Sequence, residues 1–333
     1  MTPKVDEPIV LITGGAGYVG RFCVRHLLAA GYGVVTLDRQ AAAVDPRVQS
    51  AVGDIADGPL VERLLEEHAV QVVLHLAADK SVAESMTAPG PHLRNNVCGS
   101  LALLEAMLAR GVKKIVFSSS AAVYGTPERL PVGEQARLAP DNPYGASKVM
   151  VEQALHWYHV SHGFDAVSLR YFNAAGAADD GSLGEDGAEA SNLVPRVMQA
   201  LAGLSEPLPV FGTDFATADG TAVRDYIHVE DLAAAHVRAL ELVTAGSGEW
   251  VFNLGTGRGH SVREVLLAAE RASGRPVPHR DAPRRSGDPA QVWADAGAAE
   301  RVLGWRAQRG LDDIVRSAWL WQVGQAVGDG RVG

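Results

Sequence analysis

Tyr144 and Lys148 stand four residues apart, directly after Asp141-Asn142-Pro143. Asp or Asn followed by Pro is typical of a helix start, and residues i and i+4 share one helix face. A tyrosine that exchanges protons near pH 7 needs its pKa lowered by roughly 3 units from about 10. One positive charge about 4 Å away supplies roughly that much at an effective dielectric near 20. We therefore predict that Tyr144 is a general acid and base whose phenolate is stabilised by Lys148; an exposed amphipathic pair is the alternative.

Three consecutive serines, Ser118, Ser119 and Ser120, follow the apolar run of an expected strand at Lys114–Phe117. Their hydroxyls would lie at the carboxyl edge of a parallel sheet, where doubly wound folds bind ligands. We choose Ser120 as the hydroxyl that bonds the reacting oxygen, and a polar strand-to-loop junction is the alternative. The sequence contains no zinc-binding HExxH, no P-loop and no G-x-S-x-G elbow that would compete with this set.

Gly14, Gly17 and Gly20 are spaced as G-x-x-G-x-x-G directly after the apolar run Ile9–Ile12. Such glycines let the chain turn sharply, let its backbone approach a pyrophosphate and let a helix pack closely on a strand. The free N–H groups and the positive end of that helix then face the phosphates. The spacing predicts a dinucleotide site, against the alternative of a glycine-rich turn without a ligand.

Two acidic residues support the dinucleotide interpretation. Asp38 ends the second expected strand, where a carboxylate can accept hydrogen bonds from the adenosine ribose. Asp54, after a third strand, would face the adenine edge. Because Asp38 would repel a 2′-phosphate, we expect NAD rather than NADP, and the neighbouring Arg39 is the one residue that argues the other way.

The elements that must position these residues follow a regular order. The expected strands of the first half are Ile9–Ile12, Val34–Leu37, Val72–Leu76, Ile115–Phe117 and Val167–Leu169. The expected helices are Gly20–Ala30, Leu60–His68, His92–Arg110 and Tyr144–His162. Strands that alternate with helices predict an α/β fold with a doubly wound, Rossmann-like parallel sheet. His75, inside an apolar run, is expected to be a packed core residue.

The pattern changes after Phe172 and predicts a smaller α/β substrate domain over the edge of the sheet. Residues Ala174–Ser191 are small, acidic and glycine-rich, which indicates a loop. Its acids lack the spacing of an EF-hand, so we expect no metal at Asp179, Asp180, Glu185 and Asp186. The remaining expected elements are a helix after Asn192, a strand at Leu208–Phe211, a helix at Glu230–Leu242, a strand at Val251–Leu254, a helix at Ser261–Ala272, an arginine-rich loop at Pro283–Asp288 and a closing helix with Trp319 and Trp321.

Composition excludes several classes of partner for the 333-residue chain. The net charge of −9, without any basic block, argues against nucleic acid. Only Cys23 and Cys98 occur, which argues against a disulfide framework and against a thiolate metal site. No apolar run approaches the length of a membrane span, and Ile9–Ile12 is too short for a signal peptide. We therefore expect a cytoplasmic protein that does not bind membranes.

The glycine loop, the serine and the Y-x-x-x-K pair together resemble the extended short-chain dehydrogenase/reductase superfamily. Further segments are similar to the UDP-glucose 4-epimerase (UDP-galactose 4-epimerase) family within it: Thr13–Gly20, Asn95–Val97, Ser118–Gly125, Asn142–Lys148, Leu169–Asn173, Val223–Val229 and Ala282–Asp288. The similarity runs from about Val10 to Trp321, and the last two segments are typical of nucleotide-sugar epimerases.

This resemblance implies an NAD-dependent enzyme that interconverts UDP-galactose and UDP-glucose through a transient 4-keto sugar. Tyr144 would take the proton of the sugar 4-hydroxyl, in contact with Ser120, while hydride passes to the nicotinamide. The implied cofactor-binding residues are Gly14, Gly17, Tyr18, Val19, Gly20, Asp38, Asp54, Ile55, Leu76, Ala77, Lys80, Asn96, Ser118, Tyr144, Lys148 and Phe172. The implied UDP-sugar-binding residues are Ser120, Tyr144, Asn173, Asn192, Leu193, Phe211, Arg224, Arg285, Asp288 and Val292.

The resemblance also implies a division of the chain and a partner. Residues 1–173, with a returning segment at about 222–254, would form the NAD-binding domain. Residues 174–221 and 255–333 would form the UDP-sugar-binding domain. Family members pair through the helices that correspond to His92–Arg110 and Tyr144–His162, in a four-helix bundle, so we expect a homodimer.

Three features depart from the familiar members. The segment between Asp38 and Asp54 is shorter than in the familiar bacterial epimerases, and Ala122 stands where threonine is common. Val292 stands where members restricted to unmodified hexoses carry a tyrosine, whereas members that accept N-acetyl sugars have a smaller residue. We therefore expect a wider sugar pocket, with some activity on UDP-N-acetylglucosamine and UDP-N-acetylgalactosamine.

Other functions share parts of the pattern. Another nucleotide-sugar epimerase would use the same residues. A nucleotide-sugar dehydratase needs an extra acid–base pair directly after the serine, where this chain has Ala121 and Ala122. A non-catalytic NAD-binding regulator would keep the glycine loop but would have no need for Tyr144 with Lys148. Replacing Tyr144 with Phe separates an enzyme from such a regulator.

Overall fold

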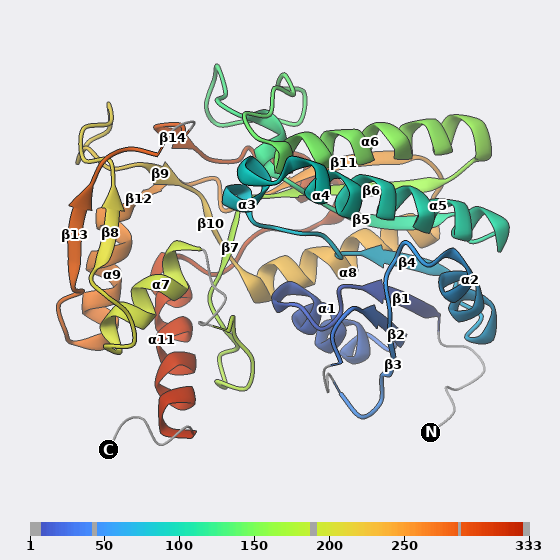
Figure 1. The fold of residues 1–333 in the computed structure, drawn as a ribbon, viewed down its shortest axis with the longest axis horizontal. Coiled ribbons are helices and arrows are strands. Elements are labelled where there is room, and N and C mark those ends of the chain that lie inside the picture. Colours follow the sequence, from blue (N-terminus) through green and yellow to red (C-terminus); the bar gives the residue numbers. More distant parts are fainter. Residues whose placement is uncertain (1–7, 42–44, 187–191, 286–287, 329–333) are drawn as a thin grey trace.

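The computed structural model describes residues 8–41, 45–186, 192–285 and 288–328. Its centre is a seven-stranded sheet with the order β11-β6-β5-β4-β1-β2-β3 (Figure 1). All neighbouring strands in this sheet are parallel. The strands are β1 (Ile9–Thr13), β2 (Gly33–Asp38), β3 (Gln49–Val52), β4 (Val72–His75), β5 (Lys114–Ser120), β6 (Asp165–Tyr171) and β11 (Glu249–Leu254). The predicted doubly wound, Rossmann-like α/β fold is confirmed.

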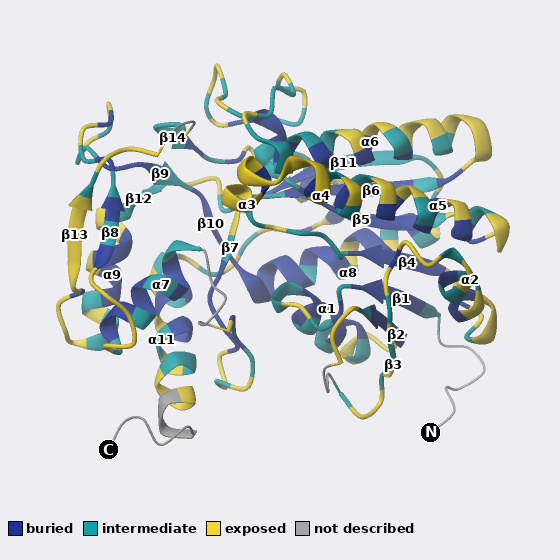
Figure 2. Ribbon diagram, viewed as in Figure 1, coloured by how far each residue is buried: buried dark blue, intermediate teal, exposed yellow. Residues whose placement is uncertain are grey.

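Helices cover both faces of the sheet, which explains why its central strands are continuous apolar runs. On one face, α1 (Tyr18–Ala29) and α8 (Val229–Ala245) pack against strand residues such as Val10 and Ile12. On the other face, α2 (Gly58–Glu67), α5 (Gly99–Ala109) and α6 (Pro143–His162) pack against strand residues such as Leu11 and Val73. Figure 2 shows the resulting buried layer at the sheet.

The direction of winding reverses beside β1. Strands β2 and β3 lie to one side of β1, whereas β4, β5, β6 and β11 lie to the other side. In such sheets a crevice opens outside the carboxyl ends of the strands at the point of reversal. The glycine loop follows β1, and the serines end β5, so both predicted features lie at this edge of the sheet.

A second group of elements packs around its own apolar core beside this edge (Figure 1). Its helices are α7 (Leu193–Leu201), α9 (Val262–Ser273) and α11 (Leu311–Gly328). Its strands are β8 (Leu208–Phe211), paired in parallel with β13 (His279–Ala282), and β9 (Val223–Arg224), which pairs with both β12 (His260–Ser261) and β14 (Gln291–Val292). Helix α9 begins at a capping box, in which Ser261 and Glu264 bond each other's backbone N–H groups.

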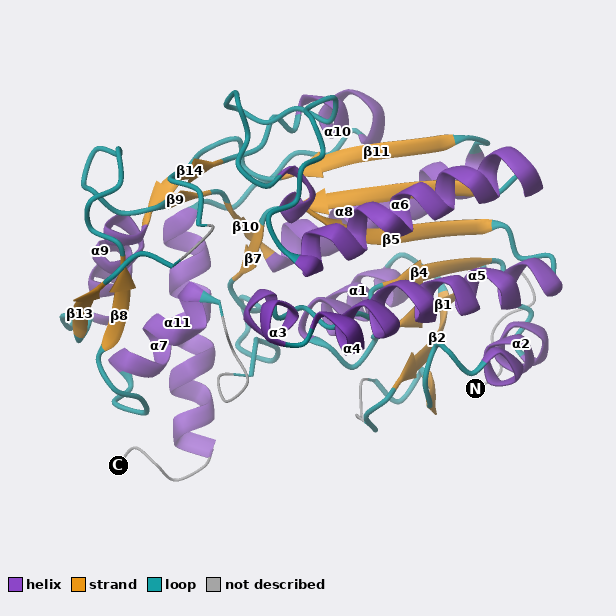
Figure 3. Ribbon diagram, turned by 45° about the horizontal axis from the view of Figure 1, so that its top comes forward, coloured by secondary structure: helices purple, strands orange, loops and turns teal. Residues whose placement is uncertain are grey.

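Several element bounds differ from the prediction. The single helix expected at His92–Arg110 is three consecutive helical segments, α4 (Pro89–Leu93), a π-helical turn at Arg94–Cys98, and α5 (Figure 3). The edge strand β3 lacks an apolar run because most of its residues are exposed. The expected loop Ala174–Ser191 begins inside a short strand, β7 (Asn173–Ala175), which pairs with β10 (Tyr226–His228); residues 187–191 lie outside the described chain.

Two short helices were not predicted, because neither is long enough to show a periodic apolar pattern. They are α3 (Val82–Thr87), capped by the Ser81 side chain, and α10 (Gly297–Leu303). A short helical turn at Ala121–Tyr124 directly follows β5. Within the described residues, no helix is long and apolar enough to span a membrane.

The prediction that His75 is a core residue is confirmed. Its ring is buried between the hydroxyls of Thr13 (2.7 Å from Nδ1) and Ser100 (2.8 Å from Nε2). Burial, with a smaller contribution from the charge of Lys148, lowers the pKa of His75 to about 3. The imidazole is therefore neutral and serves the packing of β4 rather than ligand binding.

Candidate active site

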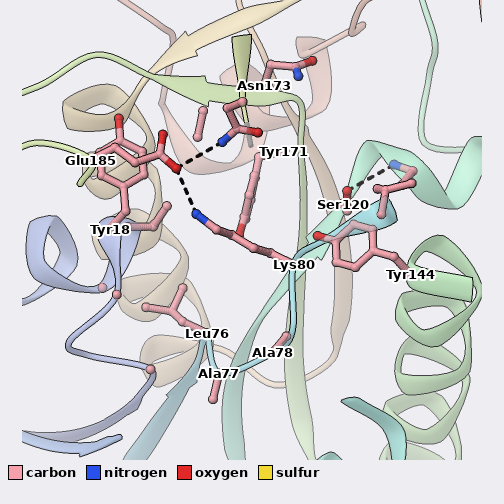
Figure 4. Close-up of a pocket in the computed structure, with 18 of the residues that line it drawn as sticks. Tyr18, Leu76, Ala77, Ala78, Lys80, Ser120, Tyr144, Tyr171, Asn173 and Glu185 are labelled. Atoms are coloured by element: carbon pink, nitrogen blue, oxygen red, sulfur yellow. Dashed lines mark hydrogen bonds and ion pairs between the residues drawn. The ribbon is translucent and has the colours of Figure 1, made fainter. Parts of the chain in front are cut away.

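A cavity of about 1300 Å³ lies between the sheet edge and the second group of elements. Its walls come from the glycine loop, from the segments after β2, β4 and β5, from the start of α6, and from β7, β9, β14 and α11. The cavity therefore lies where the reversal of winding predicts a ligand. Figure 4 shows Tyr144, Ser120 and Lys80 around it.

The glycine loop has the geometry of a phosphate-binding turn. Gly14 has a φ of +76°, and a Cβ there would lie 2.8 Å from the backbone nitrogen of Ala77. A Cβ on Gly20 would lie 2.2 Å from the carbonyl oxygen of Gly14. Helix α1 begins at Tyr18 without a side-chain cap, and its first residues line the cavity. Uncapped N–H groups at a helix start attract a diphosphate, so the loop fits a dinucleotide.

The carboxylates that follow β2 and β3 also line the cavity. Asp38 braces the glycine loop, because its carboxylate accepts from the backbone N–H of Ala16 at 3.1 Å. Asp54 accepts from the N–H of Ala56 at 2.9 Å. The guanidinium of Arg39 is engaged elsewhere, with Asp79 at 3.0 Å and Asn95 at 3.2 Å. Arg39 also lines the cavity, and the carboxylate of Asp38 beside it is the group that disfavours a 2′-phosphate.

Helix α6 presents Tyr144 and Lys148 to the cavity. The helix begins because the Asn142 side chain accepts from the N–H of Gly145 at 2.9 Å and Pro143 occupies its first turn. Both side chains line the cavity wall, and Nζ of Lys148 lies 5.8 Å from the centre of the Tyr144 ring. The predicted juxtaposition of the pair is therefore present.

Burial shifts the pKa of Tyr144 in the direction opposite to the one that this chemistry needs. Burial raises the pKa of Tyr144, and a hydrogen bond with Ser120 only partly opposes this shift. The ammonium group of Lys148 donates to the carbonyl oxygen of Ser118 at 2.8 Å, and burial lowers the pKa of Lys148 to about 8. With its pKa at about 8, Lys148 still carries its charge at pH 7, whereas burial keeps the phenol of Tyr144 protonated.

Ser120 ends β5 and lies beside Tyr144 at the cavity (Figure 4). Its hydroxyl accepts from the N–H of Ala122 at 3.2 Å, which leaves the hydroxyl proton available to another acceptor. Ala121 and Ala122 also line the cavity directly after Ser120 and carry no acid or base. The arrangement can move a proton at one oxygen, through Tyr144, with Ser120 as a second hydrogen-bonding group.

The far wall of the cavity carries the residues predicted for the UDP-sugar. Asn173, Asn192, Arg224, Asp288 and Val292 line it. Nη2 of Arg224 lies 3.9 Å from the carboxylate of Asp288, and burial lowers the pKa of this arginine. A guanidinium that is largely buried and weakly paired is suited to a diphosphate.

Most of the predicted site residues line the cavity, but five of them do not: Asn96, Ser118, Leu193, Phe211 and Arg285. Asn96 is buried, and its side chain bonds the backbone of Asp79. The hydroxyl of Ser118 contacts His236 at 3.2 Å. The guanidinium of Arg285 stacks on the ring of Phe211, with 4.0 Å between its central carbon and the ring centre. These residues support the wall from behind or lie beside it.

Several side chains that line the cavity were not predicted as site residues, among them Arg21, Tyr171, Glu185 and Trp321. Tyr171 belongs to one of the segments that carried the family resemblance, so a signal for it existed. Glu185 was treated only as a candidate metal ligand, yet it pairs with Lys80 at 2.9 Å. Asp179 and Asp180, from the same acidic stretch, pair with Arg309 and Arg25.

Comparisons with known proteins agree on one family. The model of the NAD dependent epimerase/dehydratase family matches residues 10–255. A UDP-glucose 4-epimerase from Azospirillum brasilense is 46% identical over 331 residues, which cover 96% of this chain and 95% of the relative. The UDP-glucose 4-epimerase from Bifidobacterium longum, solved in complex with NAD+ and UDP, is 42% identical, with a TM-score of 0.92 and coverage of 96% and 99%. The UDP-glucose 4-epimerase from Stenotrophomonas maltophila, solved with NAD and formylated UDP-arabinopyranose, is 43% identical, with a TM-score of 0.93 and coverage of 97% and 100%.

Proposed function

The chain belongs to the NAD dependent epimerase/dehydratase family, and we propose that it interconverts UDP-galactose and UDP-glucose by inversion at the sugar C4. It is an NAD-dependent isomerase, a UDP-glucose 4-epimerase. One observation carries the chemistry: Tyr144 lies in a single cavity that has a dinucleotide loop on one side and Arg224 on the other. An acid–base group between a cofactor wall and a diphosphate wall suits oxidation and reduction of one sugar carbon.

The cofactor-binding part of the cavity is the part around the glycine loop. When bound there, NAD supplies an acceptor and donor of hydride and a positively charged ring. We propose that the residues holding it are Gly14, Gly17, Tyr18, Val19, Gly20, Asp38, Asp54, Ile55, Leu76, Ala77, Lys80, Tyr144, Lys148 and Phe172, all of which line the cavity. Asn96 and Ser118 would act from behind this wall, Asn96 through Asp79 and Ser118 through its carbonyl oxygen on Lys148.

Tyr144 takes the proton from the sugar 4-hydroxyl and later returns it to the 4-keto oxygen. Because burial keeps the phenol neutral in the protein alone, its ionisation has to be assisted by charge that arrives with the ligands. Ser120 donates a hydrogen bond to the same sugar oxygen. Lys148, fixed by the Ser118 carbonyl, contributes a positive charge beneath the ring of Tyr144.

The diphosphate and uridine of the substrate would occupy the far wall. Arg224 supplies positive charge on this wall, and Asn173, Asn192 and Asp288 supply hydrogen-bonding groups. Arg285, stacked on Phe211 beside the wall, would add a second positive charge. Leu193 and Phe211 lie beside these residues in α7 and β8. Charge-assisted bonds at the diphosphate would let the flat 4-keto sugar turn while the nucleotide stays bound.

Val292 supports acceptance of N-acetyl sugars. It is buried in β14 and lines the cavity, and its three-carbon side chain leaves more room than a tyrosine would. We propose that the enzyme also acts on UDP-N-acetylglucosamine and UDP-N-acetylgalactosamine. The experiment on this point is a change of side-chain volume at Val292.

An apolar stripe on α6 supports a homodimer. Met150, Trp157 and Val160 are exposed at helical spacing, and Leu101 is exposed on the neighbouring helix α5. Trp157 is 63% exposed, which is unusual for so large an apolar side chain. We propose that α5 and α6 pack against the same helices of a second copy, forming a four-helix bundle.

Two further expectations belong to this proposal. The NAD-binding domain would comprise residues 1–173 with the returning segment at about 222–254, which includes α8 and β11, and the remaining residues would bind the UDP-sugar. We propose the cytoplasm as the compartment, because both cysteines of the chain are free thiols.

The test of the central proposal needs only the purified protein. UDP-galactose is added without cofactor, and the nucleotide sugars are separated by anion exchange or followed by NMR. We expect UDP-glucose to appear up to a fixed ratio with no net formation of NADH. If no conversion occurs even with added NAD, this substrate assignment is wrong, and other nucleotide sugars are tested next.

A further inference from the structure

Side chains from four separate segments of the chain bond one dipeptide, Gly184-Glu185, at the wall of the cavity. Arg21 of α1 donates to the carbonyl oxygen of Gly184 at 2.8 Å. Trp321 of α11 donates from Nε1 to the carbonyl oxygen of Glu185 at 3.0 Å. The Trp321 ring also packs against Gly184, where a Cβ would lie 2.3 Å from it. The backbone of this dipeptide is therefore clamped between the cofactor side and the sugar side.

The carboxylate of Glu185 joins the same two sides. Its Oε1 accepts from Nζ of Lys80 at 2.9 Å (Figure 4). The same oxygen accepts from Nδ2 of Asn192 at 3.3 Å. Lys80 follows β4 on the cofactor side, whereas Asn192 precedes α7 on the sugar side. Among the residues that the structure describes, the second oxygen of this carboxylate has no hydrogen-bond partner.

Because the Glu185 side chain is buried, its negative charge needs the positive charge of Lys80 as a partner. The Glu185 side chain is 7% exposed, whereas that of Lys80 is 56% exposed. A buried carboxylate is stable only when it is paired, and a long lysine side chain keeps one orientation only when a partner fixes it. Burial raises the pKa of the Tyr18 phenol at the start of α1, and the negative charge of Glu185 raises it further.

We propose that Glu185 is a positioning residue that orients Lys80 toward NAD and Asn192 toward the UDP-sugar, so that binding of the two ligands is coupled through its carboxylate. The inference rests on the proposed function for the identity of the ligands. Glu185 itself does not move the substrate proton, since Tyr144 and Ser120 lie at the other end of the cavity (Figure 4).

The test variant removes the negative charge of Glu185 and keeps the shape of its side chain. Glu185→Gln retains an oxygen that can face Lys80 but removes the negative charge. The readouts are the NAD released from the purified protein on denaturation, and the affinity of the NAD-loaded protein for UDP by calorimetry. We expect NAD retention to fall and the UDP affinity to fall about tenfold. In turnover, KM should rise while kcat at saturating NAD and substrate changes little.

Glu206→Gln is the matched control, because Glu206 is an exposed glutamate in the turn between α7 and β8. It should match the parent protein in both readouts. Unchanged NAD content and UDP affinity in Glu185→Gln would overturn the proposal. So would tighter binding of either ligand, since the carboxylate would then oppose the ligands' phosphates.

A double-mutant cycle covers the case in which Glu185→Gln fails to fold. Lys80→Gln and Asn192→Ala are made singly and together in the natural Glu185 background. Because both side chains bond one carboxylate oxygen, their effects on UDP affinity should be non-additive. Additive effects would overturn the coupling. UDP affinity and NAD content need no turnover, so these results stand even if UDP-galactose proves not to be a substrate.

Discussion

Lys148 bonds the carbonyl oxygen of Ser118 at 2.8 Å, and only its position beneath the ring connects it with Tyr144. The Lys148 ammonium also lies 4.8 Å from the ring centre of Phe117. The lysine is thus fixed by the end of β5 rather than by the phenol that it serves. The backbone therefore fixes the position of this charge, while burial raises the pKa of the Tyr144 phenol beside it.

Tyr144→Phe removes the proton carrier and keeps the ring. We expect kcat to fall by about 10² to 10⁴, the range for loss of a general acid–base group. The NAD content of the purified protein should stay close to that of the parent, because the glycine loop is untouched. Conversion of UDP-galactose by NMR and release of NAD on denaturation measure the two effects.

Phe substitution at Tyr158 provides the matched control for Tyr144→Phe. Tyr158 lies on the same helix, outside the cavity, where its hydroxyl donates to Glu105. That variant should retain full turnover. Full turnover by Tyr144→Phe instead would remove the tyrosine from the mechanism.

Three buried histidines should make the protein sensitive to acid. Burial lowers the pKa of His75 to about 3 and that of His228 and His236 to about 4. In the unfolded chain their pKa is about 6.5, so between about pH 6.5 and 4 the unfolded chain binds more protons. The stability that these groups contribute is therefore present above pH 6.5 and is lost as the pH falls toward 4. The free energy of unfolding should fall by up to about 4 kcal/mol per pH unit from these three groups.

His236→Gln isolates one of these contributions. Gln does not titrate, so the slope of unfolding free energy against pH between 6 and 4.5 should fall by about 1.4 kcal/mol per unit. Denaturant unfolding at several pH values measures this slope, and His162→Gln, on an exposed residue near the end of α6, serves as control. An unchanged slope in His236→Gln would show that this ring is already charged in the folded protein.

The sequence predicted the layers of the fold because buried parallel strands and amphipathic helices have distinct apolar periods. The same signal fails where burial is incomplete, as in β3, whose residues are mostly exposed. It also cannot detect the π-helical turn at Arg94–Cys98, within which Asn96 bonds Asp79 and Ser147. Such contacts join segments that are distant in sequence.

At the candidate site, spacing predicted Tyr144 with Lys148 and the glycine loop because each lies within one local motif. Glu185 could not be found in this way, because its partners Lys80 and Asn192 come from two other segments. Spacing also could not show that burial raises the pKa of Tyr144, because it indicates which charge is near but not how far the site is shielded from water. Desolvation is a property of the assembled cavity.

Val292→Tyr should narrow the sugar end of the cavity. Val292 is 7% exposed and lines the wall, so a phenol ring there has to extend into the cavity. We expect turnover of UDP-N-acetylglucosamine to fall at least about tenfold, since an acetamido group that no longer fits costs more than about 1.4 kcal/mol. Turnover of UDP-galactose should change much less, and both are measured on the same preparation.

Val302→Tyr, on an exposed residue of α10, is the control for the added ring and should not change the ratio of the two activities. The proposal of a wide pocket fails if the parent protein converts UDP-galactose well but shows no detectable turnover of UDP-N-acetylglucosamine. It also fails if Val292→Tyr lowers both activities equally, because the residue would then not discriminate between the sugars.

Trp157→Glu should separate the two copies of the proposed dimer. The exposed stripe of Met150, Trp157 and Val160 on α6 would be buried against the second copy. A carboxylate in the middle of this stripe would be desolvated without a positive charge to pair with, which is unfavourable. Light scattering at micromolar concentration should give a dimer for the parent and a monomer for Trp157→Glu. Leu267→Glu, on an exposed face of α9 away from this stripe, should remain dimeric.

A monomeric parent protein would refute the dimer. A dimeric Trp157→Glu would assign the interface to another surface. Because Tyr144 and Lys148 lie on the same helix as Trp157, loss of the partner should also lower kcat, and the activity of Trp157→Glu should recover as protein concentration rises.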